Sequence, residues 1–269
     1  MPAPRTVLLT GAAGGLGTLM RELLPPYGYT LRLLDLRPVE GEPDAITADL
    51  CDAGALREAV RGVDAIVHLA GISQEAPFEK ILKANIEGLY HLYEAARAEG
   101  VGRIVFASSN HAVGYTPRPR DGDPLVPVDT PRRPDTFYGL SKSFGEDLAQ
   151  FYWDKHGLET VSVRIGSCFP RPATVRSLSL WLSPADAARL FHAALTAGHV
   201  GHTVVYGSSA NTRLWWDLTS ARALGYTPRD DSEAYADEIL AAQGPLRADD
   251  EAHTRLGGHF VTDPPIWPH

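Results

Sequence analysis

A glycine-rich turn between a buried strand and a helix constrains this chain more than any other feature of its sequence. The turn, residues 10–17, reads TGAAGGLG and follows the apolar run at residues 6–10. Glycine lets such a turn bend tightly, and it brings backbone N–H groups close to a phosphate at the positive end of the next helix. The GxxGxxG spacing is a weak signal by itself, because glycine-rich turns are common. We expect the turn to hold a pyrophosphate through Gly11, Gly14, Gly15, Leu16 and Gly17.

Strand-like and helix-like segments alternate from this turn as far as Ile165. Such alternation predicts repeated βαβ units, and therefore an α/β fold with a doubly wound parallel sheet of the Rossmann type. Because the regularity falls after Gly166, we expect a dinucleotide-binding domain over residues 1–166. Residues 167–269 are expected to form a small substrate-binding cap, partly interleaved with the sheet. The predicted strands are residues 6–10, 30–35, 44–47, 65–70, 103–108, 159–165 and 203–206, and the predicted helices are residues 16–24, 52–60, 81–99, 138–156 and 184–197.

Composition excludes several classes of protein. The 269 residues carry a formal net charge of −8 and their Lys and Arg residues are scattered, so we expect no nucleic-acid partner. No apolar run approaches the roughly 18 residues of a membrane helix, and the apolar start breaks into glycines too early for a signal peptide. The two cysteines, Cys51 and Cys168, form neither a disulfide framework nor a metal-binding spacing. We therefore expect a cytoplasmic protein that binds no metal.

An acidic residue ends the second predicted strand, about 20 residues beyond the glycines, where dinucleotide-binding folds hold a ribose. Asp35 at this place can accept hydrogen bonds from both ribose hydroxyls, and it would repel a 2′-phosphate, which favours NAD over NADP. The neighbouring Arg37 leaves NADP open, because an arginine can accommodate that phosphate. Asp49, after the third strand, either meets the adenine amino group or caps the next helix, a role equally open to Asp52.

The segment YGLSK at residues 138–142 is the candidate catalytic centre. Positions i and i+4 of a helix lie on one face, so the phenol of Tyr138 and the ammonium of Lys142 are expected to be neighbours. A tyrosine pKa near 10 is too high for a base at neutral pH, and we expect the ammonium and a positively charged nicotinamide to lower it. The YxxxK spacing is common by chance, so this pair needs support from other residues.

Polar residues follow directly after the fifth predicted strand, at residues 108–111. In an open parallel sheet, ligands bind beyond the carboxyl ends of the strands. A serine at this place can hydrogen-bond the reacting oxygen beside Tyr138. We expect Ser109 to take this role and Ser108 to satisfy only the strand end.

Taken as a set, these motifs resemble the extended short-chain dehydrogenases/reductases, in their nucleotide-sugar epimerase/dehydratase group. The set consists of TGAAGGLG, Asp35, HLAG at residues 68–71, Asn85, SSN at residues 108–110 and the YxxxK of Tyr138 and Lys142. The resemblance implies that Tyr138 is the base, that Lys142 binds the nicotinamide ribose and that Ser109 is the third catalytic residue. The NAD-binding residues expected in all are Gly11, Gly14, Gly15, Leu16, Gly17, Asp35, Leu36, Asp49, Leu50, Leu69, Ala70, Gly71, Lys142, Ile165 and Cys168.

Longer segments resemble the bacterial uronate dehydrogenases, a family within this group, over nearly the whole chain. The similar segments are residues 68–97, 104–115, 137–149 and 163–172, with GSSAN and WWD near residues 207–217. The resemblance implies that Ile165 and Cys168 line the nicotinamide. It also implies that a sugar acid contacts Ser73, Ser109, Asn110, His111, Tyr138, Ser167 and Arg176. Arginine suits the carboxylate of such a substrate, because its guanidinium can form two parallel hydrogen bonds.

The sequence therefore predicts an NAD-dependent dehydrogenase that oxidises C1 of hexuronic acids, such as glucuronate and galacturonate, to the aldarolactone. A nucleotide-sugar epimerase or reductase stays open as an alternative, although the short cap counts against it. A non-enzymatic dinucleotide-sensing regulator also stays open, although Tyr138 and Lys142 are both present. The family resemblance further implies a homo-oligomer that pairs through the helices at residues 81–99 and 138–156.

Overall fold

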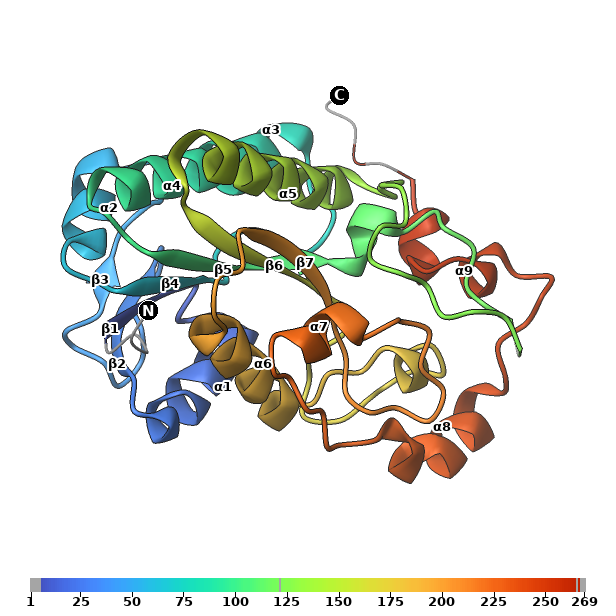
Figure 1. Ribbon diagram of the computed structural model, residues 1–269. Helices are drawn as coiled ribbons and strands as arrows, with labels where there is room; N and C mark the ends of the chain where they lie inside the picture. Colours follow the sequence, from blue (N-terminus) through green and yellow to red (C-terminus); the bar gives the residue numbers. More distant parts are fainter. Residues whose placement is uncertain (1–5, 121, 265, 267–269) are drawn as a thin grey trace.

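A parallel sheet positions every segment that the sequence singles out. The computed structural model describes residues 6–120, 122–264 and 266, and within them seven parallel strands pair in the order β3-β2-β1-β4-β5-β6-β7 (Figure 1). The strand order reverses between β1 and β4, and at such a switch point the loops diverge and leave a crevice for a ligand. The strands are β1 (Thr6–Thr10), β2 (Thr30–Asp35), β3 (Ile46–Thr47), β4 (Ala65–His68), β5 (Arg103–Ser109), β6 (Glu159–Ile165) and β7 (His202–Gly207).

Helices cover both faces of this sheet, as expected for a doubly wound fold (Figure 1). One face carries α2 (Ala53–Val60), α4 (Gly88–Ala98) and α5 (Phe137–His156). The other face carries α1 (Gly15–Leu23) and α6 (Pro184–Thr196). The remaining helices are α3 (Phe78–Ile81), α7 (Thr219–Ala223), α8 (Ala236–Gln243) and α9 (Glu251–Thr254), with short 3₁₀ turns that include η3 (Asn110–Val113), η4 (Ser177–Ser179) and η6 (Gly258–Val261).

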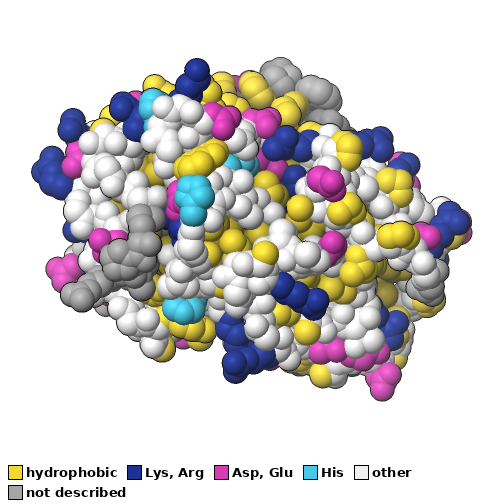
Figure 2. All heavy atoms as spheres, in the orientation of Figure 1, with side chains coloured by type: hydrophobic (Ala, Val, Ile, Leu, Met, Phe, Trp, Pro, Cys, Tyr) yellow, Lys and Arg dark blue, Asp and Glu magenta, His cyan; other side chains and the backbone are white. Residues whose placement is uncertain are grey.

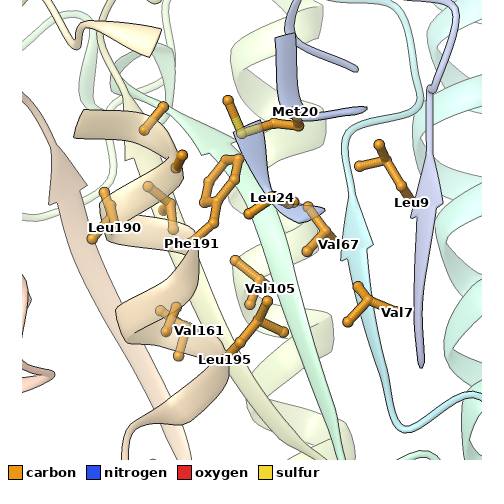
Figure 3. Close-up of a cluster of buried hydrophobic side chains, with 14 of the residues drawn as sticks. Val7, Leu9, Met20, Leu24, Val67, Val105, Val161, Leu190, Phe191 and Leu195 are labelled. Carbon is orange, nitrogen blue, oxygen red and sulfur yellow. The ribbon is translucent and has the colours of Figure 1, made fainter. Parts of the chain in front are cut away.

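Alternation of side chains along the strands produces two hydrophobic layers. Val7 and Leu9 of β1 pack in the layer with α1 and α6, whereas Leu8 packs in the layer with α2, α4 and α5. Figure 3 shows the first layer, in which Phe191 and Leu195 of α6 lie against the sheet. Full burial of a side chain of this size stabilises a fold by about 1.5–3 kcal/mol. These layers hold the carboxyl ends of the strands in a fixed arrangement beneath the site.

Most of the predicted elements are confirmed. The strands predicted at residues 6–10, 30–35 and 159–165 have those bounds, and the other four strands differ by one or two residues at an end. The helices predicted at residues 16–24, 52–60, 138–156 and 184–197 are present within one residue at each end. Periodicity and the flanking Gly and Pro residues were therefore sufficient to place them.

The continuous helix predicted at residues 81–99 is wrong in its first half. A π-helical segment, Leu82–Glu87, separates α3 from α4. Such segments accommodate an extra residue in a turn and occur often at functional sites. Here the segment carries Asn85, whose buried amide binds the loop after β4. Apolar spacing is similar in the two kinds of helix, so the pattern could not separate them.

The Pro-rich loop between η3 and α5 is held by segments from the second half of the chain. The backbone N–H of Val126 donates to Trp215 O at 2.8 Å, and that of Arg118 donates to Thr254 O at 3.0 Å. The N–H of Leu256 donates to Thr116 O at 3.0 Å. We call residues 254–261 the C-terminal segment. The C-terminal segment lies beside the Pro-rich loop. Both lie beyond the carboxyl end of β5.

Charged side chains of both signs are mixed on the surface. On the face that Figure 2 shows, Lys and Arg form small separate groups with Asp and Glu between them. In the part of the chain that the structure describes, no helix is long and apolar enough to cross a membrane. Within the same residues, no three His, Cys, Asp or Glu side chains are grouped closely enough to hold a metal ion.

Candidate active site

The glycine-rich turn joins β1 to α1 and packs against the end of β4. Gly11 has a φ of 73°, and a Cβ at this position would lie 2.7 Å from the backbone N of Ala70, so only glycine fits. A Cβ at Gly17 would collide with the carbonyl of Gly11, whereas one at Gly15 would meet nothing within 4 Å. α1 begins at Gly15 without a side-chain cap on its first N–H groups. Open space beside uncapped backbone donors fits a pyrophosphate at this helix end.

The carboxylate of Asp35 is buried at the end of β2 and is tied to the glycine turn. Its Oδ2 accepts a hydrogen bond from the N–H of Ala13 at 2.9 Å, and its Oδ1 accepts one from the N–H of Arg37 at 3.0 Å. The Arg37 guanidinium donates to the Ala13 carbonyl at 3.1 Å. Carboxylate oxygens can each accept further hydrogen bonds. A ribose therefore fits against Asp35, beside the exposed side chain of Leu36.

Asp49 and Leu50, expected near the adenine, already have partners in the protein. Asp52 rather than Asp49 caps α2, so the helix-cap alternative for Asp49 is wrong. The Asp49 carboxylate accepts from the N–H of Cys51 at 2.9 Å and pairs with Lys83 at 3.1 Å, and these contacts lower its pKa. The Leu50 side chain is buried in the core, which leaves only its main chain for a ligand.

Asn85 fixes the loop that follows β4. Its Nδ2 donates to the Ile72 carbonyl and to the Ser141 hydroxyl, each at 2.9 Å, and its Oδ1 accepts from the Ile72 N–H at 2.8 Å. Gly71, with a φ of 127°, packs directly against this amide. One side chain thus connects the π-helical segment, the loop and α5. The same loop lies beside the glycine turn, where the N–H of Leu69 donates to Thr10 O at 3.2 Å.

The candidate catalytic pair lies on the buried face of α5. The Lys142 Nζ is 5.6 Å from the centroid of the Tyr138 ring and 5.0 Å from that of Phe106. It donates a hydrogen bond to the carbonyl of Ala107 at 2.8 Å. Burial lowers the pKa of Lys142 to about 8. The predicted neighbourhood of Tyr138 and Lys142 is therefore present, with the ammonium also bound to the end of β5.

Deep burial acts against ionisation of Tyr138 in the protein by itself. It raises the pKa of Tyr138 to about 12. The Ser109 hydroxyl opposes this rise through a hydrogen bond, whereas the negative charge of Asp135 adds to it. The lowering that the sequence predicts combines Lys142 with a positively charged nicotinamide, so it stays a prediction for the protein with NAD bound.

The two serines at the end of β5 have different partners. The Ser108 hydroxyl donates to Glu146 Oε1 at 2.7 Å, away from the catalytic pair. The Ser109 hydroxyl bonds with Tyr138 and also accepts a hydrogen bond from the N–H of His111 at 3.2 Å. Ser109 is therefore the serine that the structure places against the phenol.

His111 lies next to Tyr138 and binds a buried carboxylate. Its ring meets the Tyr138 ring edge-on at 5.7 Å between centroids, and it packs on Phe260 at 4.1 Å. Its Nδ1 is 2.7 Å from Oδ2 of Asp135. Burial lowers the pKa of His111, and Asp135 partly opposes this effect.

Arg176 faces the same space from the other half of the chain. Its guanidinium donates to the main-chain carbonyl of Leu256 through both Nε and Nη2. The amide of Asn110 donates to the same carbonyl at 3.3 Å. Burial lowers the pKa of Arg176 to about 10, and the charge of Asp135 opposes this shift. Two residues that are 66 positions apart in the sequence are thus oriented by one backbone oxygen.

The other expected contacts lie at the ends of β4 and β6. Ser73 is exposed in the loop after β4. Ile165 and Cys168 are partly buried beside the end of β6, and burial raises the pKa of the Cys168 thiol to about 12. Within the described residues, the buried Oγ of Ser167 and Oδ1 of Asn110 have no hydrogen-bond partner. Buried polar atoms of this kind suit a site that hydrogen-bonds a polar ligand.

Several site residues have no signature in the sequence. Asp135 stands behind His111, and Glu75 accepts a hydrogen bond from the N–H of Tyr138 at 3.0 Å through Oε2. Phe260 covers the His111 ring, and the Leu256 carbonyl orients Arg176. The only available signal was the position of Asp135 just before the helix with YxxxK. The other three contacts depend on the tertiary fold.

A glycine-rich turn at the switch point, a buried carboxylate at the end of β2 and a Tyr–Lys pair beside a serine are the arrangement expected of a dinucleotide-dependent oxidoreductase. The chain belongs to the NAD dependent epimerase/dehydratase family, whose model matches residues 7–217. The fold and family expected from the sequence are therefore confirmed, and the family cofactor is NAD.

Similarity to individual proteins extends over nearly the whole chain. Uronate dehydrogenase of Pseudomonas syringae pv. tomato is 50% identical over 265 residues, which cover 97% of this chain and 94% of that protein. The crystal structure of uronate dehydrogenase from Agrobacterium tumefaciens is 48% identical, with a TM-score of 0.91, and the match covers 98% of this chain and 99% of that one. A mutant of that enzyme complexed with NAD is 47% identical, also with a TM-score of 0.91 and the same coverage. The resemblance to uronate dehydrogenases is confirmed.

Proposed function

We propose that this protein oxidises C1 of a hexuronic acid to the aldarolactone, with NAD as the hydride acceptor. The observation that carries the proposal is the convergence of Tyr138, Ser109, His111 and Arg176 on one side of the cofactor crevice. A base and a hydroxyl donor are suited to oxidise an alcohol, and a partly buried guanidinium nearby is suited to a carboxylate. The uronate dehydrogenases that the chain resembles support this substrate class.

The chain's own residues account for the proton transfer. The phenolate of Tyr138 removes the proton of the C1 hydroxyl while Ser109 hydrogen-bonds the same oxygen. The hydrogen on C1 leaves as hydride, and the carbon–oxygen double bond of the lactone forms. Lys142 holds the nicotinamide ribose and keeps a positive charge beside the phenolate. Because burial raises the pKa of Tyr138 to about 12, ionisation of the base depends on positive charge beside it, which oxidised nicotinamide supplies when bound.

The NAD contacts follow the geometry of the turn and the strand ends. Gly11, Gly14, Gly15, Leu16 and Gly17 surround the pyrophosphate, and Asp35 with Leu36 holds the adenosine ribose. Asp49 and the main chain of Leu50 lie by the adenine, and residues 69–71 pack along the cofactor. Ile165 and Cys168 line the nicotinamide. In this arrangement, residues 1–166 bind the cofactor and residues 167–269 close the substrate side.

The substrate carboxylate is assigned to Arg176, and the remaining polar groups of the sugar to Ser73, Asn110, His111 and Ser167. We expect wild-type protein to use glucuronate or galacturonate at least about a hundredfold better than glucose or galactose, because an unpaired buried partner costs roughly 3–5 kcal/mol. Arg176→Ala should remove most of this preference. Arg176→Lys should recover only a part, since an ammonium cannot form the two parallel hydrogen bonds.

The measurement is kcat/KM for each sugar, followed through NADH absorbance, on the wild type and the Arg176 variants. Arg171→Ala is the matched control, because Arg171 is exposed and pairs with Glu238 on the surface. UDP-sugars form a third substrate arm. Preference for them would favour a nucleotide-sugar enzyme, and an Arg176→Ala variant that discriminates like wild type would place the carboxylate elsewhere.

We further propose that the protein is a cytoplasmic homo-oligomer paired through α4, α5 and the preceding π-helical segment. Exposed apolar side chains on these helices support this surface: Tyr90, Leu140 and Phe151 are 46%, 45% and 51% exposed. Both cysteines are free, which is compatible with a reducing compartment.

A further inference from the structure

A buried carboxylate stands behind His111 and has no part in the mechanism above. The Asp135 side chain is 0% exposed, and its Oδ2 is 2.7 Å from Nδ1 of His111. Its Oδ1 accepts a hydrogen bond from the Thr136 hydroxyl at 3.1 Å. Burying a charged group is costly unless it is paired and hydrogen-bonded. The position of Asp135 therefore requires an explanation in terms of its partner.

Three glycines from separate segments leave the room that this carboxylate occupies. A Cβ at Gly114 or at Gly257 would overlap Oδ2, and one at Gly139 would lie 3.0 Å from Oδ1. These glycines belong to the loop after η3, the C-terminal segment and the first turn of α5. The first two are also joined, because the N–H of Gly257 donates to Gly114 O at 2.9 Å. The carboxylate is thus confined on several sides, with one oxygen directed at His111.

The hydrogen bond determines which nitrogen of His111 carries a proton. An ionised carboxylate only accepts hydrogen bonds, so the hydrogen lies on Nδ1. Burial, Arg176 and His259 all disfavour a positive ring, and they lower the pKa of His111 against the opposing effect of Asp135. In a neutral imidazole with hydrogen on Nδ1, Nε2 is an acceptor.

We propose that Asp135 is a positioning residue that fixes His111 in the Nδ1–H form, so that Nε2 accepts a hydrogen bond from a ring hydroxyl of the sugar acid. This inference rests on the proposed function and divides recognition between two groups. Arg176 binds the substrate carboxylate. Nε2 of His111 accepts a hydrogen bond from a substrate hydroxyl and disfavours a substrate group that can only accept one. A site built in this way rejects an analogue that lacks the hydroxyl, because its own polar group is left unpaired.

The first test observes the tautomer directly, by the ring nitrogen chemical shifts of His111 in ¹⁵N-labelled protein. The signals are assigned by their loss in His111→Gln. Wild type should show hydrogen on Nδ1, and Asp135→Ala should show a large population with hydrogen on Nε2. Asp135→Asn keeps an acceptor oxygen and should keep the wild-type form. Asp186→Ala is the control, because Asp186 is equally buried on α6 and should lower Tm without moving the His111 signals.

A second variant disturbs the same contact and leaves Asp135 in place. The added methyl of Gly114→Ala overlaps Oδ2 and should displace the carboxylate from His111. We expect Gly114→Ala to show the same mixture of His111 tautomers as Asp135→Ala. If Asp135→Ala and Gly114→Ala both retain hydrogen on Nδ1 alone, Asp135 does not set the tautomer and the proposal is wrong.

The second test is kinetic and uses uronates that each lack one ring hydroxyl. A buried partner left without its hydrogen bond costs roughly 1–3 kcal/mol, so wild type should lose about 5- to 150-fold in kcat/KM on one of these analogues. Asp135→Ala should lose a similar factor on the parent uronate, mainly through KM, and little on that analogue. In a His111→Gln background, Asp135→Ala should add nothing, because both changes remove one interaction.

Asp135→Ala could instead lose the same factor of kcat/KM on every substrate, both in wild type and in the His111→Gln background. That result would show that Asp135 only stabilises the fold, and it would overturn the proposal. Failure of the proposed function is separate, since it would appear as wild type that oxidises no uronate at all. In that case the nitrogen shifts still decide whether Asp135 fixes the ring form of His111.

Discussion

Tyr138 combines deep burial with the need to ionise. Burial raises its pKa to about 12, so the fraction present as phenolate is small at neutral pH and grows with pH. The base acts when deprotonated, and a raised pKa therefore means that activity is lost as pH falls. Among the groups around the phenol, the Ser109 hydroxyl lowers the pKa and the Asp135 carboxylate raises it.

We expect kcat/KM for a uronate at saturating NAD to rise with pH from about pH 7 and to stop rising where Lys142 loses its charge, since burial lowers the pKa of Lys142 to about 8. Tyr138→Phe should abolish both turnover and this rise. General-base contributions are roughly a hundred- to ten-thousandfold. NAD affinity should stay near wild type, because the hydroxyl is not expected to hold the dinucleotide. Stopped-flow hydride transfer and NAD titration measure the two effects. A Phe variant with a tenth of wild-type turnover would show that another group is the base.

Asp35 is expected to decide between the two dinucleotides. Its buried carboxylate would lie beside the 2′-phosphate of NADP, and like charges in a partly buried site repel strongly. Wild type should therefore use NAD far better than NADP, and Asp35→Ala should narrow the gap. Arg37→Ala is the variant to compare with Asp35→Ala, because the guanidinium of Arg37 is bound to the Ala13 carbonyl. Comparable kcat/KM for both dinucleotides in wild type would contradict this prediction.

Residue types at fixed spacing predicted the chemistry of the site but not its electrostatics. Tyr138, Lys142 and Ser109 were recognisable because helix periodicity and strand ends constrain where they lie. Asp135 had no such signature, since it is one acid in a Pro-rich loop and meets His111 only after the loop folds back. The depth at which Tyr138 is buried, which raises its pKa in the protein by itself, also had no signature in the sequence.

Among the elements, the C-terminal segment contacts both Arg176 and His111, which we propose to bind the substrate. Gly258 in this segment has a φ of 65°, and a Cβ there would lie 2.7 Å from Cδ of Arg176. Gly244 has a φ of 71° but open space around it. Alanine at either position adds backbone strain of about 1–2 kcal/mol, because L-residues disfavour this conformation. The two positions therefore differ mainly in the contact with Arg176.

We expect Gly258→Ala to raise KM for the uronate, because its methyl displaces the guanidinium. Gly244→Ala should lower Tm by a similar amount and leave KM unchanged. Steady-state kinetics and thermal unfolding of the two variants give the comparison. Equal KM values for Gly258→Ala and Gly244→Ala would mean that Arg176 tolerates the displacement or has no part in binding the uronate.

The sequence predicted the ends of a helix or strand correctly wherever the residue pattern fits only one kind of secondary structure. The strand at residues 159–165 is such a case, with β-branched residues between Gly157 and Gly166. The segment at residues 81–99 is the opposite case. Its π-helical part is stabilised by the contacts of Asn85 with the loop after β4, which are tertiary and outside any local pattern.

At the scale of the molecule, the helices α4 and α5 present apolar side chains on the outer face of one layer. If these helices pair two copies of the chain, a charge at Phe151 should separate them, because an unpaired buried charge is costly. We expect Phe151→Glu to reduce the molar mass measured by light scattering to that of one chain. Leu125→Glu is the matched control, since Leu125 is 44% exposed on the Pro-rich loop. A wild-type protein that is already monomeric would contradict the proposed assembly.

The parallel direction of the strands follows from the alternating βα segments, because parallel strands need crossover connections. The substrate side does not follow from any such rule. It is assembled from the loop after β5, the turn at Arg176 and the C-terminal segment, which meet through single hydrogen bonds to backbone groups. The resemblance to a family is what suggested Asn110, His111 and Arg176 here, and physical patterns in this chain alone did not.

The oxygen on which Arg176 and Asn110 converge belongs to the main chain of Leu256. A replacement of the Leu256 side chain leaves that oxygen in place, so a scan of single substitutions would report position 256 as a packing residue only. The two residues that follow are glycines, and changes there move the backbone itself. A new substrate preference would therefore arise more readily from a shortened, lengthened or re-registered segment than from an exchanged side chain at this position. Laboratory evolution that admits insertions and deletions at residues 255–258 would reach variants that point mutation does not.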